Sequence, residues 1–85
     1  MEKEIIIMYG TTFCGDTIRA KKVFDQYEIA YRWVNIDRDK EAEKIVKEIN
    51  KGYRSVPTII FPDGSMLVEP DKETLTIKFQ ELGLI

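Results

Sequence analysis

Residues 8–24 read MYGTTFCGDTIRAKKVF, and in this stretch a short polar loop joins an apolar run to an amphipathic pattern. The run from Ile5 to Met8 is continuous and rich in branched side chains, which is typical of a buried central strand, and Gly10 ends it. Beyond the loop, apolar side chains recur at helical spacing and predict an amphipathic helix from about Gly15 to Tyr27. Cys14, the only cysteine of the chain, therefore lies where a strand leads into a helix.

A second strand and a second helix follow. The stretch from Tyr31 to Ile36 alternates as a strand does, and with the first strand and helix it forms a βαβ unit, whose strands should be parallel with a right-handed crossover. Asp37 to Asp39 precede the second helix, and Asn50-Lys51-Gly52 ends it. The apolar stripe of this helix consists of Ala42, Ile45, Val46 and Ile49.

The last third of the chain predicts a hairpin and a third helix. Thr58 to Phe61 and Ser65 to Val68 form the two strands, joined by the turn Pro62-Asp63-Gly64. Asp71 is placed to cap the helix, in which Leu75, Phe79 and Leu82 share one face. The predicted order is β-α-β-α-β-β-α, an α/β fold.

Size and composition exclude several classes of function. The 85 residues suit one domain, residues 1–85, with a core large enough to fold unaided. The net charge of −2 argues against a nucleic-acid-binding domain, which usually shows a basic patch. No stretch approaches the roughly 20 apolar residues of a membrane span, and the charged start of the chain is unlike a signal peptide. We therefore expect a cytoplasmic protein with neither nucleic acid nor membrane as a partner.

The counts of cysteine and histidine narrow the chemistry. One cysteine cannot form an intramolecular disulfide, which fits a reducing compartment. The chain has no histidine, which is the usual base for an activated nucleophile and the commonest transition-metal ligand. We therefore expect no metal site built by this chain alone.

The position of Cys14 favours a reactive thiolate. The free N–H groups and the positive dipole end at a helix start stabilise a negative sulfur. Gly15 leaves room for close approach, and Thr17 can offer its hydroxyl to the sulfur. Asp16 opposes the thiolate, because a nearby carboxylate disfavours a second negative charge. The cations placed to offset it are Arg19, Lys21 and Lys22.

A buried structural role is the alternative for Cys14. Most lone cysteines are small buried apolar residues. The Gly-Thr-Thr sequence at residues 10–12 is polar, however, and suggests a loop at the surface. This favours a functional site.

Two motifs together resemble the glutaredoxin family. MYGTTFCGDTIRAKKVF resembles the family's strand, active-site loop and first helix, and GYRSVPTIIFPDG at residues 52–64 resembles its Thr-Val-Pro segment and hairpin. The similarity covers nearly the whole chain and is greatest to short bacterial glutaredoxin-like proteins, including the mycoredoxin type. It implies a thioredoxin-like fold, with a four-stranded mixed sheet flanked by three helices and Pro57 in the cis form.

The resemblance also implies the site residues. Cys14 would be catalytic, and Val56, beside Pro57, would pair its backbone with the bound thiol. Arg54 and Asp71 would complete the glutathione-binding residues. The active-site loop would further contain Thr12, Phe13, Gly15, Asp16 and Thr17.

The expected co-substrate is glutathione or another low-molecular-weight thiol. Its carboxylates need cationic or N–H partners, and Lys40 and Lys51 are candidates besides Arg54. The family's Gly-Gly in the fourth-strand region is replaced by residues 66–70, Met-Leu-Val-Glu-Pro. Glu69 and Asp71 would have to avoid a carboxylate there, so the identity of the thiol stays open.

Thr17 stands where two-cysteine glutaredoxins have their second cysteine. Single-cysteine exchange remains, which predicts a monomeric monothiol disulfide oxidoreductase in redox homeostasis, acting on mixed-disulfide protein substrates. One alternative is a [2Fe–2S] cluster held between two subunits by Cys14 and glutathione, although Asp16 and Thr17 depart from the Cys-Gly-Phe-Ser loop usual in such proteins. The other is a protein-binding domain without a redox role.

Overall fold

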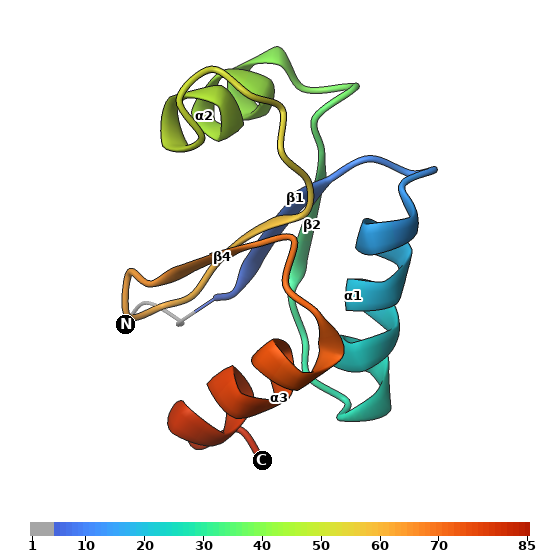
Figure 1. Ribbon diagram of the computed structural model, residues 1–85, viewed down its shortest axis with the longest axis vertical. Coiled ribbons are helices and arrows are strands. Elements are labelled where there is room, and N and C mark those ends of the chain that lie inside the picture. The colour runs from blue at the N-terminus through green and yellow to red at the C-terminus, as the bar shows by residue number, and fades with distance from the viewer. Residues whose placement is uncertain (1–4) are drawn as a thin grey trace.

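The computed structural model describes residues 5–85, which form a four-stranded sheet with helices on both faces (Figure 1). The strands are β1 (Ile7–Gly10), β2 (Arg32–Asn35), β3 (Thr58–Ile60) and β4 (Met66–Val68). The helices are α1 (Gly15–Gln26), α2 (Lys40–Ile49) and α3 (Lys72–Glu81). The order along the described chain is β-α-β-α-β-β-α, which confirms the expected α/β fold.

The sheet is mixed, as expected, with strand order β2-β1-β3-β4. β1 pairs in parallel with β2, and α1 between them completes the predicted βαβ unit. β3 runs antiparallel to both β1 and β4. Tyr9 lies opposite Thr58, so the carboxyl end of β1 and the amino end of β3 meet at one edge of the sheet.

The strand boundaries differ from the predicted ones by one or two residues. The first strand was expected at Ile5 to Met8, but the paired segment runs from Ile7, opposite Arg32, to Gly10, opposite Asn35. The apolar run does not fix which residues pair, because pairing depends on the neighbouring strands. Ile5, the first residue of the run, lies outside the paired segment and is 48% exposed. Four more residues expected in strands lie just outside them: Tyr31, Ile36, Phe61 and Ser65.

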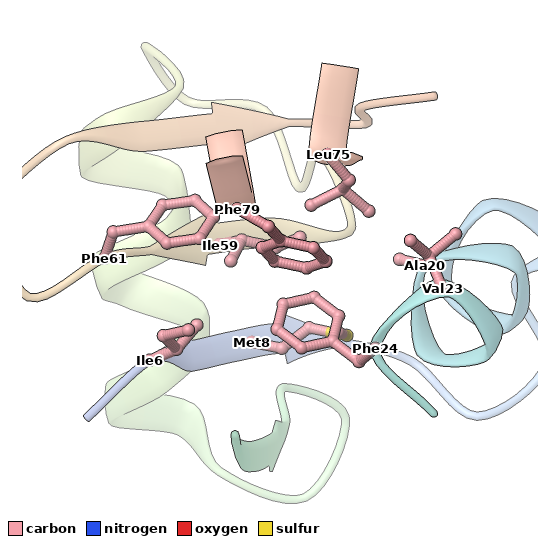
Figure 2. Close-up of a cluster of buried hydrophobic side chains, with 9 residues drawn as sticks. All are labelled: Ile6, Met8, Ala20, Val23, Phe24, Ile59, Phe61, Leu75 and Phe79. Carbon is pink, nitrogen blue, oxygen red and sulfur yellow. The ribbon is translucent and has the colours of Figure 1, made fainter. Parts of the chain in front are cut away.

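Apolar clusters on the two faces of the sheet hold the helices in place. α1 and α3 cover one face and α2 covers the other (Figure 1). In the larger cluster, the rings of Phe24 and Phe79 meet edge to face with centroids 4.9 Å apart (Figure 2). Its other buried members are Ile6, Met8, Ala20, Val23, Ile59, Phe61 and Leu75. The cluster under α2 consists of Tyr9, Ile36, Ala42 and Val46.

The three helices begin in different ways. Asp39 caps α2 by accepting a hydrogen bond from the Ala42 N–H at 3.0 Å. Asp71 caps α3, as predicted, by accepting from the Thr74 N–H at 2.8 Å. At α1 the N-cap residue is Cys14, and its side chain makes no capping hydrogen bond. The start of α1 therefore differs from the other two in lacking an oxygen cap.

Candidate active site

The thiol of Cys14 lies between two loops at one edge of the sheet. Its backbone is extended (φ −93°, ψ 124°) and the residue is partly buried. The thiol donates to the carbonyl oxygen of Val56 across 3.8 Å. The peptide bond between Val56 and Pro57 is cis, as the resemblance implied. The loop after β1 and the loop before β3 thus meet at the sulfur.

The loop before α1 leaves the approach to the sulfur open. Phe13 is 96% exposed. A side-chain carbon added at Gly15 would have no other heavy atom within 4 Å, apart from its chain neighbours and its own helix backbone. Thr12 is tied to β2, because its hydroxyl accepts a hydrogen bond from the Asn35 side-chain amide at 3.1 Å. The loop is therefore anchored on one side and accessible on the other.

Asp16 forms an ion pair with Arg19 one turn further along α1. This pairing is the offset predicted from the sequence, and it compensates the charge that opposes a thiolate at Cys14. Lys21 makes a cation–π contact instead, with its ammonium 3.5 Å from the centre of the Trp33 ring.

The prediction that the Thr17 hydroxyl supports the sulfur is wrong. Thr17 is fully buried, and within the described residues its Oγ1 has no hydrogen-bond partner. The side chain packs under the loop instead: a carbon added at Gly10 would lie 2.9 Å from Thr17 Oγ1 and also 2.9 Å from Trp33 Cζ3. The threonine turns inward because the first turn of α1 covers the end of β1.

The guanidinium of Arg54 is occupied by two carboxylates. Arg54 Nη2 lies 2.5 Å from Asp37 Oδ1, and Arg54 Nε lies 2.6 Å from Glu43 Oε2. The hydrogen bond that Arg54 donates to the Asp37 carboxylate is the main reason that the pKa of Arg54 is raised, with the charge of Glu43 adding to it. A thiol carboxylate that binds Arg54 must therefore compete with these partners.

Asp71 and Glu69 lie on the segment that leads into α3. Hydrogen bonds from the Thr74 backbone N–H and hydroxyl hold the pKa of Asp71 below its usual range. The ionised carboxylate therefore caps α3, the helix that it precedes. Glu69 adopts a left-handed backbone (φ 50°), and its N–H donates to the Pro57 carbonyl at 2.8 Å. This bond places the start of α3 beside the Val56–Pro57 loop.

A polar network that the sequence pattern does not reveal holds the Val56–Pro57 loop. The Asn50 side-chain amide donates to the Thr58 hydroxyl at 3.1 Å, and that hydroxyl donates to the Ser55 carbonyl at 2.7 Å. The amide of Asn50 also donates to the Val46 carbonyl at 2.9 Å. The sequence places Asn50 only at the end of a helix, and its backbone there is not left-handed (φ −106°). Its contact with Thr58 joins two segments eight residues apart, and no local sequence pattern indicates such a contact.

The remaining predictions concern two lysines, metal binding and membrane spans. Lys40 and Lys51 are exposed. Within residues 5–85, no group of three or more Asp, Glu, Cys or His side chains is arranged to hold a metal ion. None of the described helices has the length and apolar character needed to cross a membrane.

The mixed sheet, the cysteine at the start of α1 and the cis-proline opposite it define a thioredoxin-like fold with a thiol site. The family model described as Glutaredoxin matches residues 6–66. The chain belongs to the glutaredoxin family and is a glutaredoxin-like thiol oxidoreductase. The resemblance seen in the two sequence motifs is confirmed.

Relatives support this assignment over nearly the full chain. A Mycobacterium tuberculosis protein named "Putative glutaredoxin" is 34% identical over 78 residues, which cover 92% of this chain and 93% of that protein. Mycoredoxin 1 of Corynebacterium glutamicum is 31% identical over 78 residues, covering 92% and 96%.

Solved structures agree with the fold. Oxidized glutaredoxin 2 from Chlamydomonas reinhardtii superposes with a TM-score of 0.70 at 25% identity, over 96% of this chain and 85% of that one. A buckwheat glutaredoxin in complex with glutathione gives a TM-score of 0.67 at 20% identity, over 95% and 73%.

Proposed function

We propose that this chain exchanges disulfides through Cys14 alone, with glutathione or another low-molecular-weight thiol as its co-substrate. The observation that carries the proposal is the position of the only thiol, at the uncapped start of α1 and 3.8 Å from the Val56 carbonyl oxygen. Glutaredoxins use glutathione-type thiols, and the buckwheat relative is a complex with glutathione. Thr17 provides no second sulfur, which leaves exchange with a small thiol.

The exchange runs in two steps. The Cys14 thiolate attacks the glutathione sulfur of a protein–glutathione mixed disulfide, the S–S bond breaks, and the protein sulfur leaves as a thiolate that takes up a proton. Cys14 is then disulfide-bonded to glutathione. The thiolate of a second glutathione attacks the bound glutathione sulfur, which forms glutathione disulfide and releases the Cys14 thiolate. Each step conserves electrons within the thiol and disulfide pairs.

The site residues have distinct roles in this proposal. Val56, beside Pro57, offers its backbone for strand-like pairing with the thiol's cysteine. Arg54 supplies a cation for one carboxylate, and the N–H groups at the start of α3, next to Asp71, supply donors for another. The active-site loop around Cys14 further contains Thr12, Phe13, Gly15, Asp16 and Thr17.

The proposal also covers the domain organisation, the oligomeric state and the cellular location of the protein. The whole chain, residues 1–85, acts as one glutaredoxin-like domain and as a monomer, since Cys14 and Val56 come from the same chain. It needs no resident metal. A single cysteine suits the reducing conditions of the cytoplasm.

Mass spectrometry after incubation with oxidised glutathione tests the proposal. We expect a single adduct on Cys14, absent from Cys14→Ser. Turnover of a glutathionylated peptide should fall to background in the same variant. Turnover that is unchanged in Cys14→Ser would contradict the proposed function.

A further inference from the structure

A cleft with a basic rim lies between α1 and the start of α3. Its volume is about 300 Å³. Figure 1 shows the segment that leads into α3 passing beside α1. The cleft is lined by Arg19, Ala20, Lys22, Val23, Gln26, Pro70, Lys72 and Leu75. None of these residues is acidic, although the chain as a whole carries a net charge of −2.

The floor of the cleft is apolar and its rim is cationic. Ala20, Val23 and Leu75 are buried, and they belong to the core cluster beneath both helices. Lys22 and Lys72 are exposed on opposite sides, one on α1 and one on α3. Such a surface is complementary to a peptide with an apolar side chain flanked by carboxylates.

The two lysines are available to a partner. Within residues 5–85, no carboxylate lies within 4.0 Å of the ammonium of Lys22 or Lys72. Arg19, at the end of the cleft nearer Cys14, pairs with Asp16. The nearby acidic residue Asp71 is turned to its own helix by its bond to the Thr74 N–H. Among the residues that line the cleft, the two charges without an ion-pair partner in the described chain, Lys22 and Lys72, are therefore both positive.

The cleft begins close to the reactive sulfur. Ala20 lies on α1, six residues after the N-cap residue Cys14, which corresponds to a rise of roughly 9 Å along the helix axis. An extended peptide covers that length in about three residues. A substrate whose cysteine carries the mixed disulfide attacked by Cys14 could therefore place residues three to five positions away in the cleft.

We propose that the cleft between α1 and α3 binds an acidic segment of the protein substrate, near the cysteine that carries the mixed disulfide. This inference rests on the proposed function, since the substrate is the protein half of that disulfide. The small thiol occupies the Val56–Pro57 loop and the N–H groups at the start of α3, and the cleft, which extends further along α1, selects among proteins. Charge complementarity between the rim lysines and substrate carboxylates provides the preference.

Paired peptides test the selectivity. Both are glutathione mixed disulfides, and they differ only in Glu-Leu-Glu against Gln-Leu-Gln placed four residues from the cysteine. We expect kcat/KM for the acidic peptide to be about 5-fold higher, since two exposed charge pairs together contribute on the order of 1 kcal/mol. The preference should shrink as salt is raised. Lys22→Glu/Lys72→Glu should abolish or reverse it.

A matched variant controls for net charge. Lys44 and Lys47 are exposed on α2, on the other face of the sheet. Lys44→Glu/Lys47→Glu changes the total charge equally and should keep the preference. Equal turnover of both peptides by the unmodified protein would overturn the inference while leaving the proposed function standing. A rise in KM for glutathione with the peptide preference intact in the Lys22/Lys72 variant would also overturn it.

A binding measurement separates the two proposals. If neither peptide is turned over, the proposed function fails, and the cleft is then tested with an acidic peptide that lacks cysteine. Backbone amide NMR shifts centred on Ala20, Val23 and Leu75 support the cleft. Shifts that are absent there, or equal with the Gln-Leu-Gln peptide, overturn it.

Discussion

The thiol of Cys14 and the carbonyl oxygen of Val56 lie 3.8 Å apart although 42 residues separate them. The antiparallel pairing of β1 with β3 produces this meeting, because Tyr9 lies opposite Thr58. Cys14 follows Tyr9 by five residues and Val56 precedes Thr58 by two. The register of two central strands therefore sets the geometry of the site.

Two buried threonines should respond oppositely to the same substitution. Thr17 and Thr58 are both fully buried, but Thr58 bonds to Ser55 and Asn50 whereas the Thr17 hydroxyl lacks a partner among the described residues. A buried unpaired hydroxyl costs about 1–3 kcal/mol. We expect Thr17→Val to raise the free energy of unfolding by about 1 kcal/mol and Thr58→Val to lower it by about 1–3 kcal/mol. Urea denaturation measures both, and destabilisation by Thr17→Val would contradict the buried, unpaired state.

Gly10 and Gly15 should differ in their tolerance of alanine. An added carbon at Gly10 meets Thr17 and Trp33 at 2.9 Å, whereas none of the heavy atoms considered lies within 4 Å at Gly15. We expect Gly10→Ala to lower the free energy of unfolding by about 1–3 kcal/mol through overpacking. Gly15→Ala, in the first turn of α1, should raise the free energy of unfolding by less than about 1 kcal/mol.

A double variant tests whether Thr17 is the cause of the clash at Gly10. Thr17→Ala removes two of the three atoms that an added carbon would meet. Gly10→Ala should therefore be less destabilising in that background, and urea denaturation of all four proteins gives the coupling. Strictly additive effects would mean that the first turn of α1 is not packed on β1 as described.

The sequence predicted the order of elements because its signals are local. Apolar spacing, the Asp71 cap and the hairpin turn each lie within one segment, and each was confirmed. The predicted strand boundaries differed by one or two residues, because strand pairing depends on neighbouring strands that a local hydrophobic pattern does not identify. The cis bond at Pro57 followed only from the family resemblance.

The site was less predictable because its contacts join distant segments. Cys14 at a helix start was visible in the sequence, but the inward turn of Thr17 depends on Gly10 and Trp33. The pairing of Arg54 with Asp37 spans 17 residues, and a positive charge alone does not reveal its partner. Side-chain direction, rather than residue type, was the missing information.

Asp71 should make stability depend on acid pH. Its hydrogen bonds to Thr74 hold its pKa below the usual range, so the carboxylate stabilises the fold above its unfolded pKa of about 3.9. That stabilisation is lost as pH falls through the lowered folded pKa. Asp71→Asn can still cap α3 but does not titrate. The stability gap between the unmodified protein and Asp71→Asn should therefore narrow as urea midpoints are measured from neutral pH down to about pH 2. A gap that is constant with pH would show that Asp71 does not use its charge at the cap.

Asp37 should weaken the binding of a carboxylate-bearing thiol by holding Arg54. Arg54 faces Asp37 at 2.5 Å and Glu43 at 2.6 Å, so an incoming carboxylate meets a guanidinium that is already paired. Asp37→Asn should lower KM for glutathione by about 2- to 5-fold, the scale of one partly exposed charge pair. Arg54→Gln should raise KM and should also remove the effect of Asp37→Asn, because the competition acts through Arg54. Steady-state kinetics on one mixed-disulfide substrate measures the four variants of this cycle. If Asp37→Asn lowers KM equally in the Arg54→Gln background, Asp37 acts through general repulsion and Arg54 is not the carboxylate's partner.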